Sequence, residues 1–307
     1  MKCSAITLLR QAIAVPWLVV SLASSAWGQG SATLNKIEQT GIITLGYRVG
    51  SVPFSYLDEK LNPIGYSMDL CHKVVDAVKA RLKLRHLQAK LFAVTSATRI
   101  PMVVNGTVDL ECGVTTNTWE RQKSESFSVT TFVAVSRLLA KRSSDIQTLG
   151  DLQGKSVAST VGTTSIRYLH EMNQMQKLDM KILAGLDDAE SFQMVQTDRA
   201  VAYVMDDVLL RSLVAGAKNP GQFVISTESL SIEPYGIAMI KGDAVFKQLV
   251  DDVLVGLFRS GEIHSIYDKW FQSPVPPKGI NLQLPMSAAL KRAIAAPSDN
   301  ADPRHYE

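Results

Sequence analysis

The chain has 307 residues, 46% of them hydrophobic, and its formal net charge is only +3 at neutral pH. This length allows roughly two domains with sizeable cores. Basic and acidic side chains are interspersed, which excludes the long basic run typical of nucleic-acid-binding proteins, so no nucleic-acid partner is expected.

The first 28 residues follow the order of a secretory signal peptide. Lys2 and Arg10 flank the start of an apolar stretch that ends in small residues near Ala26 and Gly28. The alternative is a retained membrane anchor, but the apolar stretch is short for a spanning helix. The sequence therefore predicts cleavage after Ala26 or Gly28 and export of the remaining chain.

Two cysteines, Cys71 and Cys112, remain after the predicted leader. An oxidising compartment permits a disulfide between them. The sequence does not show whether their Cα atoms come close enough for that bond. A disulfide and two buried free thiols therefore both stay open.

The rest of the chain alternates between predicted strands and helices. The first half has strands at 42–47, 87–94, 108–113 and 131–141, and helices at 67–82 and 96–105. The second half has strands at 155–160, 181–185, 200–205, 222–227 and 234–240, with helices at 163–176, 189–197, 207–217 and about 245–270.

This alternation predicts an α/β fold with mostly parallel sheets covered on both faces. Because the pattern restarts near residue 145, we expect two lobes in a discontinuous layout: lobe 1 from 33–133 and 235–280, and lobe 2 from 134–234. Two strands would then cross between the lobes and form a hinge beside a cleft. The segment 281–307 is expected to be a polar tail with one amphipathic patch, disordered in part.

Polar side chains gather where the predicted strands end, which is where open α/β sheets bind their ligands. In chain order these residues are Arg48, Ser96, Arg99, Thr116, Arg121, Thr163, Thr164 and Asp206. Three arginines, several hydroxyls and one acid predict a cleft for a small ligand that has carboxylates and one cationic group. Arginine suits carboxylates because its planar fork can bind both oxygens.

Most of these residues also have an ordinary structural explanation. Arg48 could be a surface residue at a turn, and Thr163 with Thr164 could cap a helix, although a helix start also offers free N–H groups to an anion. Arg99 is harder to explain in this way. It lies in the first turn of a predicted helix, where the macrodipole disfavours a cation by about 0.3–1 kcal/mol.

Several motifs resemble those of a known family. GYRVGSVPFSY, TSATRIPMVVNGTVDLECG, TTNTWERQKSESFS, VGTTS, AVAYVMDD and YDKWFQSPVPPKGINL are similar to segments of the periplasmic glutamate/aspartate-binding proteins of amino-acid ABC transporters. These belong to the family-3 extracellular solute-binding proteins. The resemblance covers nearly the whole chain after the leader, and the motifs occur in the family's order.

The resemblance implies a two-lobed periplasmic-binding-protein-like fold of type II, with two crossing strands between the lobes. It implies a periplasmic monomer that binds an amino acid and delivers it to a membrane ABC permease, with no cofactor, no metal and no catalytic residue. Arg121 and Thr116 would hold the α-carboxylate, and Asp206 the α-ammonium. The residues that would face the side-chain carboxylate or close over the ligand are Arg48, Ser96, Arg99, Thr163 and Thr164.

Two positions depart from the family's pattern. Val114 follows the ECG motif where close relatives have a serine that touches the ligand, so it can offer only backbone groups. Asp188 stands where they have a histidine that contacts the acidic side chain. A carboxylate there would repel an acidic ligand, pair with Arg48 or Arg99, or accept a hydrogen bond from an amide. Glutamine and asparagine therefore stay open as alternatives to glutamate and aspartate.

An enzyme on the same fold, such as a periplasmic dehydratase, is a competing hypothesis because fold does not settle function. Asp188 lends it some weight, since an unexpected carboxylate in a cleft can act as a general acid or base. Against it, the sequence has no GxSxG, HExxH, CxxC or GxGxxG motif, and its five histidines are scattered. We therefore expect a binding protein. A sensor that docks on a receptor rather than a permease stays open.

Overall fold

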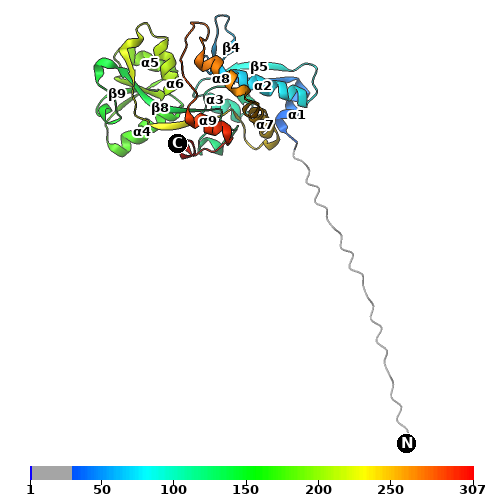
Figure 1. The fold of residues 1–307 in the computed structure, drawn as a ribbon. Helices are drawn as coiled ribbons and strands as arrows, with labels where there is room; N and C mark the ends of the chain where they lie inside the picture. The colour runs from blue at the N-terminus through cyan, green and yellow to red at the C-terminus, as the bar shows by residue number, and fades with distance from the viewer. Residues whose placement is uncertain (2–29) are drawn as a thin grey trace.

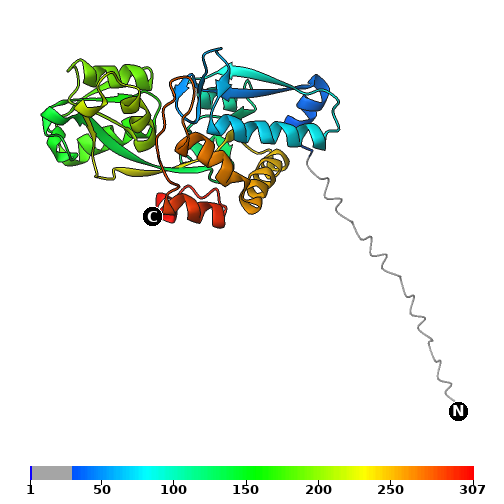
Figure 2. The same ribbon diagram turned by 45° about the horizontal axis from the view of Figure 1, so that its top comes forward.

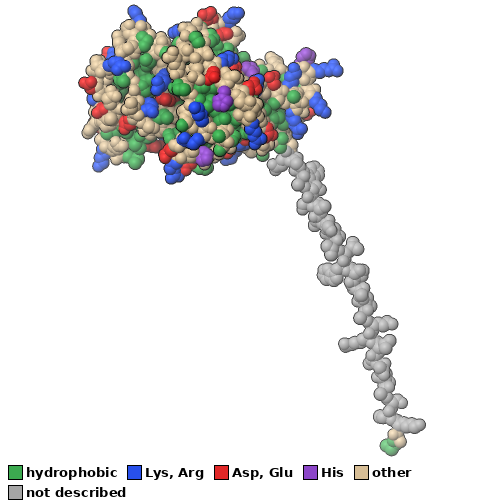
Figure 3. Space-filling view, viewed as in Figure 1, with side chains coloured by type: hydrophobic (Ala, Val, Ile, Leu, Met, Phe, Trp, Pro, Cys, Tyr) green, Lys and Arg blue, Asp and Glu red, His purple; other side chains and the backbone are tan. Residues whose placement is uncertain are grey.

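The computed structural model describes Met1 and residues 30–307. The predicted signal peptide, apart from Met1, lies outside the described residues. Two lobes lie side by side and are joined by extended strands (Figures 1 and 2). Acidic and basic side chains are mixed over the face drawn in Figure 3. No helix in the described part of the chain is long and apolar enough to cross a membrane.

Lobe 1 is built on a five-stranded sheet with the order β5-β1-β6-β14-β7. Its strands are β1 (Ile42–Tyr47), β5 (Gln88–Ala93), β6 (Leu110–Glu111), β7 (Glu125–Phe127) and β14 (Ala238–Ile240). β1 pairs in parallel with β5 and β6, whereas β14 runs antiparallel to β6 and β7. Ile43 and Leu45 of β1 are fully buried, as its apolar sequence predicts.

Helices cover this sheet. They are α1 (Ala32–Thr40), α2 (Tyr66–Arg81), α3 (Arg99–Val104), α7 (Ala244–Ser260), α8 (Glu262–Tyr267) and a π-helical turn, Asp268–Gln272. A small sheet of β2 (Gly50–Ser51), β3 (Ser55–Leu57) and β4 (Pro63–Ile64) follows β1. The disulfide that the sequence left open is present, because Cys71 of α2 bonds to Cys112 just after β6.

Lobe 2 has a sheet of order β10-β9-β11-β8-β12, with β13 also pairing with β8. The strands are β8 (Phe132–Lys141), β9 (Ser156–Thr160), β10 (Lys181–Gly185), β11 (Ala202–Asp206), β12 (Phe223–Ile225) and β13 (Ser231–Tyr235). Its helices are α4 (Thr164–Gln176), α5 (Asp188–Gln196) and α6 (Asp207–Ala215). Short 3-10 turns occur in both lobes and in the tail. They are η1 (Arg121–Lys123) in lobe 1, η2 (Arg142–Ser144), η3 (Gly150–Leu152) and η4 (Pro220–Gln222) in lobe 2, and η6 (Pro303–Tyr306) in the tail.

The strands β8 and β13 cross between the lobes as an antiparallel pair, with Phe132 opposite Tyr235 and Ser136 opposite Ser231. The predicted single strand at 234–240 is therefore wrong. It is divided at Gly236 into β13, which pairs with β8, and β14, which joins the sheet of lobe 1. The two-lobed α/β fold class is confirmed. The sheets are less parallel than predicted, because the chain enters β8 and β14 from the opposite lobe.

The tail differs from expectation. It contains α9 (Ala288–Ala295) and η6, and Leu290 and Tyr306 are buried. The prediction of partial disorder is wrong, because the amphipathic patch forms the helix α9 and packs against the protein. Helix α9 packs against β8 and β13. These two strands lie side by side only in the folded protein, so no local sequence pattern predicts the contact.

Candidate functional site

The strand ends of the two lobes lie against each other at the position predicted for the cleft. Arg121 Nη2 in lobe 1 donates to the carbonyl oxygen of Gly162 in lobe 2 at 3.3 Å. Gly162 has a positive φ of 77°, and a Cβ built on it would lie 2.7 Å from the backbone of Ser96 and Ala97. Only glycine fits at this point of contact. The lobes therefore touch at the ends of β5 and β9.

Arg99 is the most deeply buried cation of the cleft. It begins α3, is 2% exposed, and donates from Nη1 to the Val114 carbonyl oxygen at 3.3 Å. Its Nε has no partner, and no carboxylate of the described residues lies within ion-pair distance. Burial, helped by the charges of Arg121 and Arg48, lowers the pKa of Arg99 to about 9. The guanidinium is still protonated at neutral pH.

Arg48 and Ser96 add two more unsatisfied donors to the same lobe. Arg48 follows β1 and its backbone N–H donates to Ser55 Oγ at 2.9 Å, but its Nη1 is buried without a partner. Ser96 is 2% exposed and its Oγ also lacks a partner. Arg48 is thus no exposed turn residue, and this alternative is wrong.

Arg121 and Thr116 form a second polar group on the segment after β6. Arg121 begins η1 and donates from Nη1 to the Thr116 carbonyl oxygen at 2.8 Å. Thr116 is buried and makes an isolated β-bridge with Tyr235, at the end of β13. Burial lowers the pKa of Arg121, while Glu233 and Glu125 oppose that shift. The segment therefore links the hinge to the cleft.

Asp206 supplies the acid of the site. It ends β11 and precedes α6, yet its side chain makes no helix-capping hydrogen bond. One carboxylate oxygen accepts from the Tyr235 hydroxyl, and the other is buried without a partner. Burial raises the pKa of Asp206, and the neighbouring Glu233 raises it further. Asp207 is engaged elsewhere, because its Oδ1 accepts from the Val135 N–H at 3.2 Å.

The hydroxyls of Thr163 and Thr164 are already paired within the protein. Thr163 caps α4, since its Oγ1 accepts from the Ile166 N–H at 3.2 Å. Thr164 Oγ1 donates to Glu233 Oε2 at 2.7 Å. The capping explanation offered for this pair is therefore confirmed for Thr163. The N–H groups at the start of α4 are what this loop can still offer to an anion.

Asp188 is held within lobe 2. It is the first residue of α5, and its Oδ1 accepts from Thr160 Oγ1 at 2.7 Å and from the Tyr203 hydroxyl at 3.0 Å. It forms no ion pair with Arg48 or Arg99 among the described residues. Asp188 also lines a cavity of about 420 Å³ between the lobes, with Val49 and Phe192. Val114 is 4% exposed and reaches Arg99 through its carbonyl oxygen.

Sequence reasoning missed several buried polar residues around the cleft. Glu111 Oε2 accepts from Thr115 Oγ1 at 2.7 Å, while its Oε1 has no partner. A Cβ on Gly113 would lie 2.2 Å from Glu111 Oε1 and 2.9 Å from Arg48 Cγ, so these two side chains pack against a glycine. Burial raises the pKa of Glu125, against the nearby charges of Arg121 and Arg99. The sequence signal for this buried polar group was Glu111, a charged residue within the predicted strand 108–113.

Unpartnered buried atoms are concentrated at this cleft. A buried polar group without a hydrogen bond costs about 1–3 kcal/mol, and such groups are rare in native proteins. In the described part of the chain they are Arg48 Nη1, Ser96 Oγ, Arg99 Nε, Glu111 Oε1, Glu125 Oε1 and Asp206 Oδ1. Four of the six belong to predicted site residues. Most of the buried polar atoms that lack a hydrogen-bond partner in the described residues therefore lie at the cleft.

Comparison with known proteins gives the family. Residues 43–273 match the bacterial extracellular solute-binding proteins, family 3. The chain is a family-3 solute-binding protein. Its relatives include the "L-glutamate/L-aspartate-binding protein" of Pseudomonas aeruginosa, 52% identical over 272 residues, which are 88% of this chain and 90% of that protein.

Two further comparisons support the same family and its fold. The "Glutamate/aspartate import solute-binding protein" of Salmonella typhimurium is 44% identical over 95% of this chain and 98% of its own length. The crystal structure of a mutant of ArgBP from T. maritima has a TM-score of 0.69 and 30% identity, and covers 78% of this solute-binding protein and 98% of that chain. These curated relatives are binding proteins rather than enzymes.

Proposed function

We propose that this protein binds glutamate or aspartate in the cleft between its lobes and delivers it to an ABC permease. It would work in the periplasm as a monomer, without cofactor or catalysis. The observation that carries this proposal is the set of buried, unpartnered groups: donors on Arg48, Ser96 and Arg99, and an acceptor on Asp206. A dicarboxylate with one ammonium group supplies the matching acceptors and donor.

The proposed roles follow from the placement of these groups. Arg121, beside Thr116, binds the α-carboxylate, because its guanidinium lies where the two lobes meet. Asp206 binds the α-ammonium through its unpaired Oδ1. Arg48, Ser96 and Arg99 bind the side-chain carboxylate from lobe 1. From lobe 2 the loop at Thr163 and Thr164 closes over the ligand with its backbone N–H groups.

The required affinity is within reach of such contacts. A Kd of about 1 μM corresponds to about −8 kcal/mol. Glutamate has about ten heavy atoms, so each would contribute about −0.8 kcal/mol, which is below the ceiling for small ligands. Charge-assisted hydrogen bonds to buried arginines are the strongest available contacts of this kind.

An amide ligand, glutamine or asparagine, is the second candidate, and Asp188 is the observation that favours it. A carboxylate near the cleft disfavours a second carboxylate on the ligand. The Thr160 and Tyr203 hydroxyls that donate to Asp188 offset part of this effect, because they stabilise its charge inside lobe 2. Arg48 and Arg99, which are assigned to the side-chain carboxylate, favour the acids, so we place glutamate and aspartate first.

The test is a calorimetric titration of the protein after refolding to strip any bound ligand. Glutamate, aspartate, glutamine and asparagine are titrated separately at neutral pH. We expect micromolar or tighter binding of the two acids and much weaker binding of the amides. Tight binding of the amides alone would replace the first candidate by the second. No heat from any of the four would overturn both.

A further inference from the structure

The C-terminal segment 287–307 lies across the two hinge strands. Figures 1 and 2 show α9 and η6, in red, against β8 at the junction of the lobes. Its apolar contacts are made with both crossing strands: Val133 of β8 and Ile232 of β13 pack with Ala289, Ala293 and Tyr306. The tail is therefore attached to the part of the molecule about which the lobes would move.

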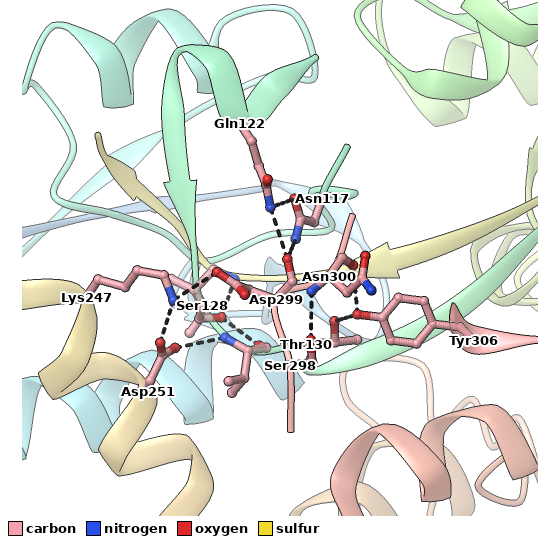
Figure 4. A network of polar contacts seen from close by, with 12 residues as sticks. Asn117, Gln122, Ser128, Thr130, Lys247, Asp251, Ser298, Asp299, Asn300 and Tyr306 are labelled. Carbon is pink, nitrogen blue, oxygen red and sulfur yellow. Dashed lines mark hydrogen bonds and ion pairs between the residues drawn. The ribbon is translucent and has the colours of Figure 1, made fainter. Parts of the chain in front are cut away.

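The same tail is hydrogen-bonded to the segment that carries Arg121. The carbonyl oxygen of Asp299 accepts from Asn117 Nδ2 at 2.8 Å and from Gln122 Nε2 at 3.0 Å (Figure 4). Gln122 Nε2 also donates to Asn117 Oδ1 at 2.9 Å. Asn117 directly follows Thr116, and Gln122 directly follows Arg121. One carbonyl oxygen of the tail thus holds both ends of the segment 117–122.

A second group of contacts ties the tail to the start of β8. The Ser298 carbonyl oxygen accepts from the Thr130 N–H at 2.8 Å. The Tyr306 hydroxyl lies 2.7 Å from Thr130 Oγ1 and donates to the Asn300 carbonyl oxygen at 2.8 Å (Figure 4). Thr130 stands two residues before β8. The tail therefore fixes the hinge strand at its lobe 1 end.

An ion-pair network anchors the tail to lobe 1. Lys247 of α7 pairs with the Asp299 carboxylate at 3.1 Å and with Asp251. Asp251 Oδ1 accepts in turn from the Val129 N–H at 2.8 Å. Lys247 and Asp251 are largely buried, so solvent screens that pair less than an exposed one, whereas the Asp299 side chain is about half exposed. Asp299 is thus held on one side by a helix and holds the Arg121 segment on the other.

Outside the tail, the segment 117–122 is held by hydrogen bonds at a few points, among them one from Lys241 Nζ to the Gln122 carbonyl oxygen at 2.7 Å. Its regular structure is limited to the start of the single turn η1. It is joined to the hinge by the bond from the Asn117 N–H to the Pro234 carbonyl oxygen at 2.7 Å, next to the Thr116–Tyr235 bridge. A ligand group must be placed within about 0.5 Å for a charge-assisted contact to reach full strength. The position of Arg121 therefore depends on whatever fixes this segment.

We propose that residues 298–306 are a brace that holds the segment 117–122 and the start of β8 in the geometry needed for ligand capture. Asn117, Gln122 and Tyr306 are positioning residues, which act through Arg121 and Thr116. This inference rests on the proposed function, in which Arg121 binds the α-carboxylate. Since that group is common to all amino acids, the brace affects their binding equally and leaves selectivity unchanged.

The test compares Gln122→Met with the unchanged protein and with Gln153→Met, a matched substitution at an exposed turn of lobe 2. Gln122→Met keeps the side-chain length and removes both donated hydrogen bonds. We expect glutamate and aspartate to bind about tenfold more weakly, with their affinity ratio unchanged. Gln122→Lys, which keeps a donor for the Asp299 carbonyl oxygen, should recover most of the affinity. Gln153→Met should bind like the unchanged protein.

Hydrogen exchange of the ligand-free proteins separates the brace from the proposed function. In Gln122→Met the amides of 117–124 should exchange faster, and in Tyr306→Phe the Thr130 amide should do so, while α4 and α5 are unaffected. Unchanged exchange, or faster exchange with unchanged affinity, would overturn the brace. If the unchanged protein bound no amino acid, the proposed function would fail, and the exchange rates alone would decide whether the brace exists.

Discussion

Arg121 Nη2 donates to the Gly162 carbonyl oxygen of the opposite lobe at 3.3 Å, while its Nη1 donates to Thr116 of its own lobe at 2.8 Å. One cation therefore contacts both walls of the cleft. Gly162 also lies against Ser96, so the lobes meet at the place where the ligand's charged groups are expected to lie. Closure and recognition thus involve the same side chain.

Arg121→Met should strongly weaken binding of every amino acid, because the α-carboxylate is common to all of them. Truncating one partner of a buried, hydrogen-bonded charge pair costs about 2–5 kcal/mol, which is roughly a 30- to 4,000-fold loss of affinity. Calorimetric titration measures this loss. Arg85→Met, an exposed arginine of lobe 1, is the control and should bind normally. An affinity for any one amino acid that Arg121→Met leaves unchanged would contradict the assigned role.

Arg99→Met should change selectivity and raise stability together. Removing this cation weakens the acids more than the amides, since Arg99 is assigned to the side-chain end of the ligand. The ligand-free protein should gain about 1–3 kcal/mol in its free energy of unfolding, because a buried charge without a carboxylate partner is replaced by an apolar group. Equal losses for acids and amides would show that Arg99 does not face the ligand's side chain.

The difference in free energy of unfolding between the unchanged protein and Arg99→Met should depend on pH. The pKa of Arg99 is lowered to about 9 in the folded protein, so above that pH the folded state binds fewer protons than the unfolded state. The unchanged protein should therefore gain stability relative to Arg99→Met as the pH rises through 9. Urea unfolding at pH 8 and pH 10 measures the difference between the two proteins. A constant difference would mean that Arg99 keeps its ordinary pKa.

Much of this architecture can be predicted from local sequence patterns. The bounds of β1, β9, β10 and α4 agree with the predicted ranges within about one residue, because apolar runs and caps are local signals. The short strand β7 and the division of 234–240 could not be predicted, since both depend on pairing with β14 or β8 across the chain. For the same reason the sequence showed an amphipathic patch in the tail but not the strands against which it packs.

The features of the site could also be predicted from the sequence only in part. Strand-end positions predicted where Arg48, Arg99 and Asp206 would lie, because parallel strands end at one edge of a sheet. The sequence could not show that the hydroxyls of Thr163 and Thr164 are committed to protein partners. It also could not show that Asp188 is held by hydroxyls from β9 and β11, because that contact joins residues far apart in the chain.

Asp188→Asn should raise the affinity for glutamate relative to glutamine by several-fold. The change removes a negative charge near the cleft and preserves the shape and an oxygen that can accept from Thr160 and Tyr203. Titrations with both ligands give the ratio. Asp179→Asn, an exposed carboxylate of the same lobe, is the control. An unchanged ratio would mean that the charge of Asp188 is not felt at the ligand's side chain.

Asp206 should make ligand binding and stability depend on pH in opposite ways. Burial and the nearby Glu233 raise its pKa in the folded protein, so the folded state binds more protons than the unfolded state above about pH 4. Stability of the ligand-free protein should fall as the pH rises from there through the raised pKa. Asp206→Asn should remove that fall and be more stable at pH 7, as urea unfolding would show.

Binding requires the ionised form of Asp206, because the ligand's ammonium group is its proposed partner. The cation lowers the pKa of this carboxyl on binding, so a proton is released at pH values below the raised pKa. Glutamate affinity should fall as the pH is lowered through that range, and Asp206→Asn should bind no amino acid. Titrations near neutral pH should be more exothermic in imidazole than in phosphate, because imidazole takes up the released proton with more heat. Equal heats in the two buffers would show that Asp206 is already ionised before the ligand arrives.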